Sequence, residues 1–244
     1  MTTIIRRFGS PAQFPGTIVL DLEAPINWSG AAPQGHFRFA KSLQNALRNR
    51  AGGANASVSN NAEPVIDDRS ISLASSTALS VAGSAAMPLT FLSVFRQSAT
   101  AVNQTLMGNP STSGADSAGL GVSSGGNLIA FARAGGSNFS ASLPKNGGDR
   151  WEFVAGTFDN SGGAGAGVLR LHRPRTGSIA EVTNATIPAS VGTLRIIGAA
   201  TGTLNQAVQG ALSAFWIGTA LSESQINAIY ASARESLAPS GVDI

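Results

Sequence analysis

The chain has no cysteine among its 244 residues, which excludes disulfide cross-links, thiolate metal sites and a cysteine nucleophile. Charged side chains are also scarce, at 12% of the residues, about half the usual share. Lys41 and Lys145 are the only lysines, the net charge is +3, and the arginines are scattered rather than clustered. Because binding to a phosphate backbone needs a clustered basic surface, we expect no nucleic-acid partner.

Long apolar segments are missing as well. No run approaches the roughly 20 apolar residues that span a bilayer, and Phe8–Pro11 after Arg6-Arg7 is not the apolar core of a signal peptide. The sequence therefore predicts no membrane association and no signal peptide. We expect synthesis in the cytoplasm, and a place of action in a virion or outside the cell after lysis.

Short apolar segments are abundant, and they recur at the spacing of strands. Phe139, Ala141 and Leu143 alternate with polar residues, which is the period-two pattern of a strand with one wet face. The glycine pairs Gly125-Gly126 and Gly135-Gly136 supply tight turns at the two ends of another strand, predicted over residues 127–133. Many such strands in one chain predict an all-β fold, a jelly-roll β-sandwich.

The two ends of the chain depart from this pattern. Residues 1–50 are interrupted by prolines and are predicted to be an N-terminal arm, with a strand over Thr17–Leu22 and helix-like spacing over His36–Arg50. Residues 51–244 are predicted to form the sandwich. Near the C-terminus, Ser222 and Gln225 predict a capping box that starts a short helix, docked at an edge or end of the sandwich. The helix has one apolar stripe: Ile226, Ile229, Tyr230, Ala233 and Leu237.

The stretch Trp151–Asp159, a Trp-led strand, and Leu221–Ile226, reading Leu-Ser-x-x-Gln-Ile, resemble the laminin G-like, concanavalin A-like sandwich family. The resemblance implies a jelly-roll sandwich in which Trp151 and Trp216 are core residues. Two features depart from the family pattern. Phe158 stands where the family has Tyr, and the segment His172–Gly177 replaces an Asn-Gly turn.

Nothing in the sequence argues for catalysis. Glucanases of this superfamily resemble one another in a Glu-x-Asp-x-x-Glu strand, and no such triplet occurs here. Glu152 is expected to point outward without a carboxylate partner, whereas glycoside hydrolysis needs two carboxylates. His36 and His172 are expected at the surface. The sequence therefore predicts a protein that is not an enzyme, and a glycoside hydrolase ranks last among the alternatives.

Calcium is the one cofactor that the resemblance implies, because many relatives bind it at the sandwich rim through Asp and Asn. No loop has the dense acidic spacing of a dedicated calcium site. The alternative is that these residues hydrogen-bond the backbone of their own turns. The metal candidates are Asp67, with the adjacent Asp68, and Asp116, and the ligand-binding candidates in loops are Asp149, Asp159 and Asn160.

Trp28 is a further ligand-binding candidate, because it lies in a loop of the arm. There it could stack on a sugar, anchor a partner subunit or pack on its own domain. Two functions stay open. One is a structural or adhesion module of a bacteriophage virion, homo-oligomeric and bound to other virion proteins, with the arm mediating assembly. The other is a lectin-like module that binds a glycan.

Overall fold

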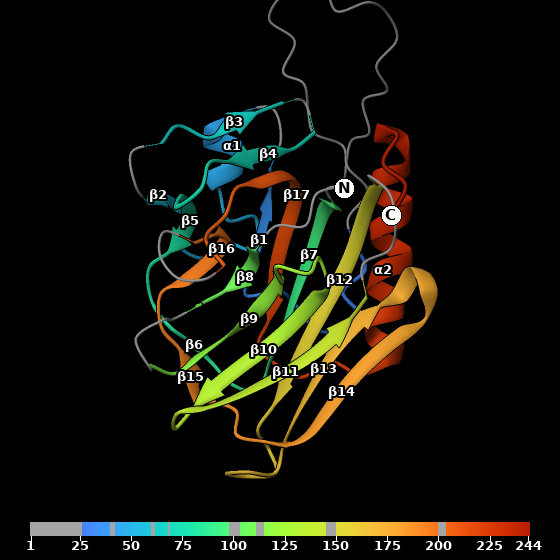
Figure 1. Ribbon diagram of the computed structural model, residues 1–244. Helices are drawn as coiled ribbons and strands as arrows, with labels where there is room; N and C mark the ends of the chain where they lie inside the picture. Colours follow the sequence, from blue (N-terminus) through green and yellow to red (C-terminus); the bar gives the residue numbers. More distant parts are fainter. Residues whose placement is uncertain are drawn as a thin grey trace, which may run out of the picture.

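The computed structural model describes residues 26–39, 42–59, 62–67, 69–97, 103–110, 115–144, 150–199 and 204–244. Two large antiparallel sheets lie face to face, and the C-terminal helix packs on the outside (Figure 1). The predicted all-β jelly-roll sandwich with a short C-terminal helix is therefore confirmed. The strand predicted over Thr17–Leu22 lies outside the described residues.

The first sheet has eight strands in the order β14-β13-β12-β7-β17-β4-β3, and β1 also pairs with β17. Its strands are β1 (Gly35–Arg38), β3 (Val65–Ile66), β4 (Ile71–Leu73), β7 (Leu89–Gln97), β12 (Arg150–Asp159), β13 (Gly167–Arg173), β14 (Ser178–Ala185) and β17 (Val208–Ile217). The Trp-led strand of the sequence is β12, which lies between β13 and β7.

The second sheet has seven strands in the order β11-β10-β9-β8-β16-β5-β2. Its strands are β2 (Ser57–Ser59), β5 (Ala78–Val81), β8 (Gln104–Gly108), β9 (Ser117–Val122), β10 (Leu128–Ala134), β11 (Ser137–Leu143) and β16 (Leu194–Gly198). A small pair, β6 (Ala85–Ala86) and β15 (Ser190–Val191), lies apart from both sheets. The helices are α1 (Leu43–Leu47), α2 (Glu223–Leu237) and the 3-10 turns η2 (Pro174–Thr176) and η3 (Ala238–Ser240).

The main core lies between the two sheets, and the period-two pattern of the strands builds it. In β10, for example, Leu128, Ala130 and Ala132 face inward and are buried. Their neighbours on the same strand face outward and are only half-buried. Each strand of the seven-stranded sheet thus has one dry face and one face turned away from the core.

A second apolar layer lies on the outer face of the eight-stranded sheet. Phe153 and Phe215 of this face are fully buried, and Ile226 and Ile229 of α2 pack in the same cluster. Ser222 and Gln225 form the predicted capping box. The helix therefore covers a sheet face, and the prediction that it plugs an edge or end was wrong. Trp151 also belongs to this layer and is half-buried, not part of the core between the sheets.

The segment His36–Arg50 is not one helix, as its spacing had predicted. Residues 35–38 form β1 and pair with the C-terminal half of β17. Phe37 and Phe39 are both fully buried, and Phe37 stacks on Trp216 with ring centroids 6.0 Å apart. Phe37 and Phe39 are two residues apart, which matches the period of a strand. Pairing with β17 therefore favours a strand over a helix for this segment. Only the five residues of α1 are helical, after the N-cap Ser42.

Two polar residues are buried where the sequence predicted exposure. Glu152 has no exposed surface, and its Oε1 atom accepts a hydrogen bond from Nε of Arg150 at 2.8 Å. Nε of the buried Arg173 lies 3.7 Å from Oε2 of Glu152. His172 is only 3% exposed, and burial, followed by Arg170, lowers its pKa to about 4. Glu152 lies on the side of β12 that carries the core residues Val154 and Phe158, so it faces the interior between the sheets. The prediction of exposure was wrong for both residues.

Candidate functional site

The outer face of the seven-stranded sheet has no helical cover over its centre. In the described part of the chain, α2 packs on the other sheet, and neither helix makes extensive contacts with β8, β9, β10 or β11. The side chains that β10 turns outward are Ile129, Phe131 and Arg133, all half-buried. Residues of β8 and β9 are buried throughout, so the accessible part of this face lies over β10 and β11. A half-buried aromatic ring on this part is the feature that marks the region as a candidate site.

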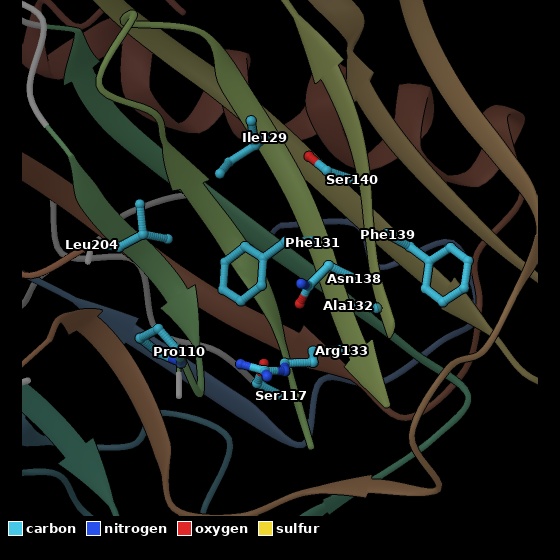
Figure 2. A pocket seen from close by; sticks show the side chains of 10 residues that line it. All are labelled: Pro110, Ser117, Ile129, Phe131, Ala132, Arg133, Asn138, Phe139, Ser140 and Leu204. Carbon is cyan, nitrogen blue, oxygen red and sulfur yellow. The ribbon is translucent and has the colours of Figure 1, made fainter. Parts of the chain in front are cut away.

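A groove of about 370 Å³ runs over these strands (Figure 2). This volume is within the range of about 300–1,000 Å³ that small-molecule sites occupy. Its outward-facing lining includes Ser117, Ile129, Phe131, Arg133, Asn138 and Ser140. Figure 2 shows Phe131, Asn138 and Arg133 close together along the face, whereas Phe139 lies apart on the other side of β11.

Strand register arranges the lining in rows across the sheet. One row places Arg133 between Ser117 of β9 and Asn138 of β11. The next row, two residues along β10, places Phe131 between Gly119 and Ser140. Residues two apart on a strand are separated by about 6.8 Å. The aromatic ring therefore has polar groups beside it in its own row and in the adjacent row.

Glycines form the floor of the groove. A Cβ atom on Gly119 would lie 2.8 Å from Cζ of Phe131, so the ring leans across β9 over this glycine. A Cβ atom on Gly121 would lie 3.1 Å from Cδ1 of Leu204, which covers the neighbouring position. The absence of side chains at these two positions leaves the Phe131 ring space to lie along the sheet instead of standing away from it.

Two arginines are the only charged residues within the seven strands, and both belong to the outer face. Nε of Arg133 is buried and has no hydrogen-bond partner in the described structure. Nε of Arg195 in β16 is also without a partner, but its Nη1 donates to Oδ1 of Asn109 and to the Thr193 carbonyl. Burial lowers the pKa of Arg195. Arg133 is therefore the arginine of this face for which no hydrogen bond to a described residue is found.

The predicted metal residues lie in separate turns. Asp67 accepts hydrogen bonds from the backbone N–H groups of Arg69 (2.7 Å) and Ser70 (2.5 Å) between β3 and β4. Burial alone would raise the pKa of Asp67, but the hydrogen bonds from Arg69 and Ser70 outweigh it and hold the pKa below its usual value. Asp116, just before β9, accepts a longer bond from Gly135 N at 3.4 Å.

The predicted ligand residues Asp159 and Asn160 lie at the end of β12. Oδ1 of Asp159 accepts from Ser161 N at 2.9 Å, and hydrogen bonds from Ser161 hold the pKa of Asp159 below its usual value. The Asn160 carbonyl accepts from Gly163 N. Asp68 and Asp149 lie outside the described residues.

The described aspartates do not fit a calcium site. Among the residues that the structure describes, no group of three His, Cys, Asp or Glu side chains could hold a metal ion. Calcium takes six to eight oxygen ligands, whereas Asp67 and Asp159 each direct carboxylate oxygens at the N–H groups of their own turns. We therefore derive no role for calcium at these positions.

Trp28 lies on the other side of the molecule, at the edge of the layer under α2. Its ring meets His36 and Phe215 edge to face, with centroids 5.3 and 5.0 Å apart. The side chain is half-buried in this cluster. Of the three roles considered for Trp28, packing on its own domain is the one that these contacts describe.

A second hollow, of about 510 Å³, lies beside α1 and is lined by amide groups and Arg48. Asn49 organises it: its Oδ1 atom accepts from His36 N and Ala51 N, and its backbone N–H donates to Oδ1 of Asn55. Its described lining contains no aromatic ring and no apolar side chain. It offers hydrogen bonds but no surface on which a ligand could stack, so the sheet groove is the stronger candidate.

No site residue predicted from the sequence lies in this groove, which is lined by Phe131, Arg133, Asn138 and Ser140. A signal for them existed, because the two-residue turn Gly135-Gly136 pairs residue 133 with 138 and residue 131 with 140. The polar face of β11 was recognised in the sequence. Extending it across this turn would have placed Phe131 and Arg133 on the same wet face.

None of the described helices combines the length and the apolar character that crossing a bilayer requires.

Known structures share this fold, although no family profile and no curated protein matches the sequence. Domain 4 of AbnA, a GH43 extracellular arabinanase from Geobacillus stearothermophilus, was solved in complex with arabinotriose. It superposes with a TM-score of 0.62 at 12% identity, over 82% of this chain and 98% of that one. The receptor-binding domain of botulinum neurotoxin D gives 0.58 at 15%, over 83% and 53%.

The binding domain of botulinum neurotoxin DC in complex with SialylT gives a TM-score of 0.55 at 14% identity, over 82% of this chain and 52% of that one. The chain thus spans about half the length of the two toxin structures. At these identities the likeness shows the β-sandwich fold alone.

Proposed function

We propose that the protein is a non-enzymatic carbohydrate-binding module of the laminin G-like, concanavalin A-like type, and that it binds a glycan in the groove over β9, β10 and β11. The observation that carries the proposal is the Phe131 ring lying over Gly119 with Arg133, Asn138 and Ser140 beside it. The Trp-led β12, its hairpin partner β13 and the capped α2 support the family assignment.

The chemistry of the groove matches the two surfaces of a sugar ring. The C–H groups of a pyranose or furanose form an apolar face that stacks on an aromatic ring. The hydroxyl groups at its edge both donate and accept hydrogen bonds, as do the amide of Asn138 and the hydroxyl of Ser140.

The groove is proposed to bind without catalysis. Among the described residues that line it there is no Asp, Glu or His, hence no pair of carboxylates to act on a glycosidic bond. Glu152 is buried between the sheets with Arg150 and Arg173. These observations support a binding role over the hydrolase alternative.

Two structural neighbours support a saccharide ligand for this proposal. One of them is in complex with arabinotriose and another with SialylT, and both share this sandwich. The virion location, the homo-oligomer and an assembly role for the N-terminal segment rest on composition alone, and they stay predictions.

The proposal is tested by screening the purified protein against a glycan array and measuring hits by calorimetry. Phe131→Ala should weaken binding at least tenfold, because the ring supplies the stacking surface. Trp28→Ala is the matched control, an aromatic residue of the opposite layer, and should leave affinity unchanged while the protein is folded. Binding that survives Phe131→Ala, no binding to any glycan, or release of cleaved sugar would each contradict the proposal.

A further inference from the structure

The seven-stranded sheet is free of acidic residues. Its strands contain two charged side chains, Arg133 and Arg195, and both lie on the outer face. The eight-stranded sheet, in contrast, contains Glu152, Asp159 and Glu181 among its strands. The nearest carboxylate along the sequence from the groove lining is that of Asp116, which accepts a hydrogen bond from Gly135 N.

Arg133 lacks a counter-ion in the described structure. Nε of Arg133 is buried without a partner, and no ion pair joins Arg133 to any described carboxylate. Partial burial removes water from a guanidinium group without removing its charge, so an unpaired group of this kind is costly to the protein. A neutral hydroxyl from a ligand would replace lost water only, whereas an anion would also compensate the charge.

The position of Arg133 relates it directly to a stacked sugar. It follows Phe131 by two residues on the same face of β10, a separation of about 6.8 Å along the strand. Substituents of a sugar ring stacked on Phe131 extend over this distance. The planar fork of a guanidinium group matches the paired oxygens of a carboxylate or a sulfate.

We infer that the groove selects saccharides that carry an anionic group, a carboxylate or a sulfate ester, and that Arg133 reads that group. The inference rests on the proposed glycan-binding function and names its substrate class. Arg195 does not share the role, because it is already bonded to Asn109 and Thr193. Phe131 provides the stacking affinity that acidic and neutral sugars share. Arg133 provides the additional affinity for acidic sugars.

Three matched pairs of saccharides test the inference by calorimetry: trigalacturonate and its methyl ester, sialyllactose and lactose, and sulfated and desulfated neocarrabiose. The anionic member of at least one pair should bind at least tenfold more tightly, and added salt should reduce this difference. The pair that shows this difference in affinity identifies the preferred anionic group as a carboxylate or a sulfate.

Arg133→Gln should abolish the difference within the responding pair by weakening the anionic member at least tenfold more than the neutral one. Arg133→Lys should restore part of it, because it keeps the charge but loses the fork. Arg195→Gln is the control and should retain the full difference. Circular dichroism of each variant checks folding.

The possible failures are distinguishable. If neutral and anionic members of every pair bind equally, or if Arg133→Gln keeps the preference, the inference is overturned while glycan binding stands. If neither member of any pair binds to the wild-type protein, and the glycan array is also negative, the proposed function falls with it.

Discussion

The outer face of the eight-stranded sheet carries Leu92, Val94, Phe153 and Phe215, and α2 covers them. The outer face of the seven-stranded sheet carries Phe131, Arg133, Asn138 and Ser140 over a glycine floor, and no described helix packs there. The first face is a dry layer that adds stability, since burial of apolar area is the main favourable term in folding. The second keeps polar and aromatic groups available to a ligand.

The comparison teaches that one architecture can serve two ends through the composition of its outward positions. Both sheets turn apolar residues toward the core between them. Their outward residues differ. The large apolar side chains on the outer face of the eight-stranded sheet need α2 to shield them from water. Mutations on the covered face should therefore change stability, and mutations on the bare face should change binding.

Removing the cover should have the largest effect. Truncation after Leu221 deletes α2 and exposes Phe153 and Phe215 to water. An apolar patch of this kind favours self-association, so we expect aggregated protein. Size-exclusion chromatography and thermal unfolding check the result. A soluble monomer that unfolds cooperatively would show that the second layer is dispensable.

The same substitution, phenylalanine to alanine, can be made on the outer face of each sheet. Phe153 is fully buried under α2, so Phe153→Ala should cost about 3–5 kcal/mol of unfolding free energy. Phe131 is half-buried on the bare face, and Phe131→Ala should cost only about 1 kcal/mol. Urea denaturation measures both. Equal losses would mean that Phe131 is a core residue rather than part of a ligand surface.

Acid should weaken the covered sheet. The pKa of His172 is about 4 in the folded protein against 6.5 unfolded, so the unfolded state binds more protons between these values. Stability is full above about pH 6.5 and falls as the pH drops toward 4, by on the order of 2–3 kcal/mol for this group.

His172→Gln should flatten the dependence of unfolding free energy on pH over this window. His36 belongs to the same sheet, and its pKa is also lowered to about 4 by burial and then by Arg50 and Arg38, so it should supply the remaining slope. Parallel pH curves for the wild-type protein and the His172→Gln variant would refute the assignment.

The smallest effect concerns single hydrogen bonds on each side. The Ser222 side chain caps α2 by accepting from Gln225 N, and Ser222→Ala should cost about 1 kcal/mol. Asn138→Ala on the bare face should change unfolding free energy by less than about 0.5 kcal/mol while it weakens glycan binding. Chemical denaturation of both variants checks the difference, and a larger loss for Asn138→Ala would contradict it.

The sequence predicted much of the fold because the signals were local. The alternation in β11, the glycine turns and the capping box of α2 each lie within a few residues of one another. The strand β1 was missed, because Phe37 also fits the helix-like spacing of Ala40, Leu43 and Leu47 until its pairing with β17 is known.

The groove was missed for a related reason. Phe131 and Arg133 become a site only through the register of β10 with β9 and β11. The hairpin turns at Gly125-Gly126 and Gly135-Gly136 specify both registers, whereas the lack of a covering helix on this face depends on tertiary packing. The candidates taken from loops, such as Asp67 and Asp159, had polar side chains that their own turns use.

The central claim, that the bare sheet face is where a glycan binds, is tested most directly by NMR. Backbone amide shifts of the labelled protein are followed while the tightest saccharide from the array is added. We predict that the largest shifts fall on Gly119, Gly121, Phe131, Arg133 and Ser140. Shifts concentrated on α2 and Trp28, or around the amide-lined hollow at Asn49, would contradict the account.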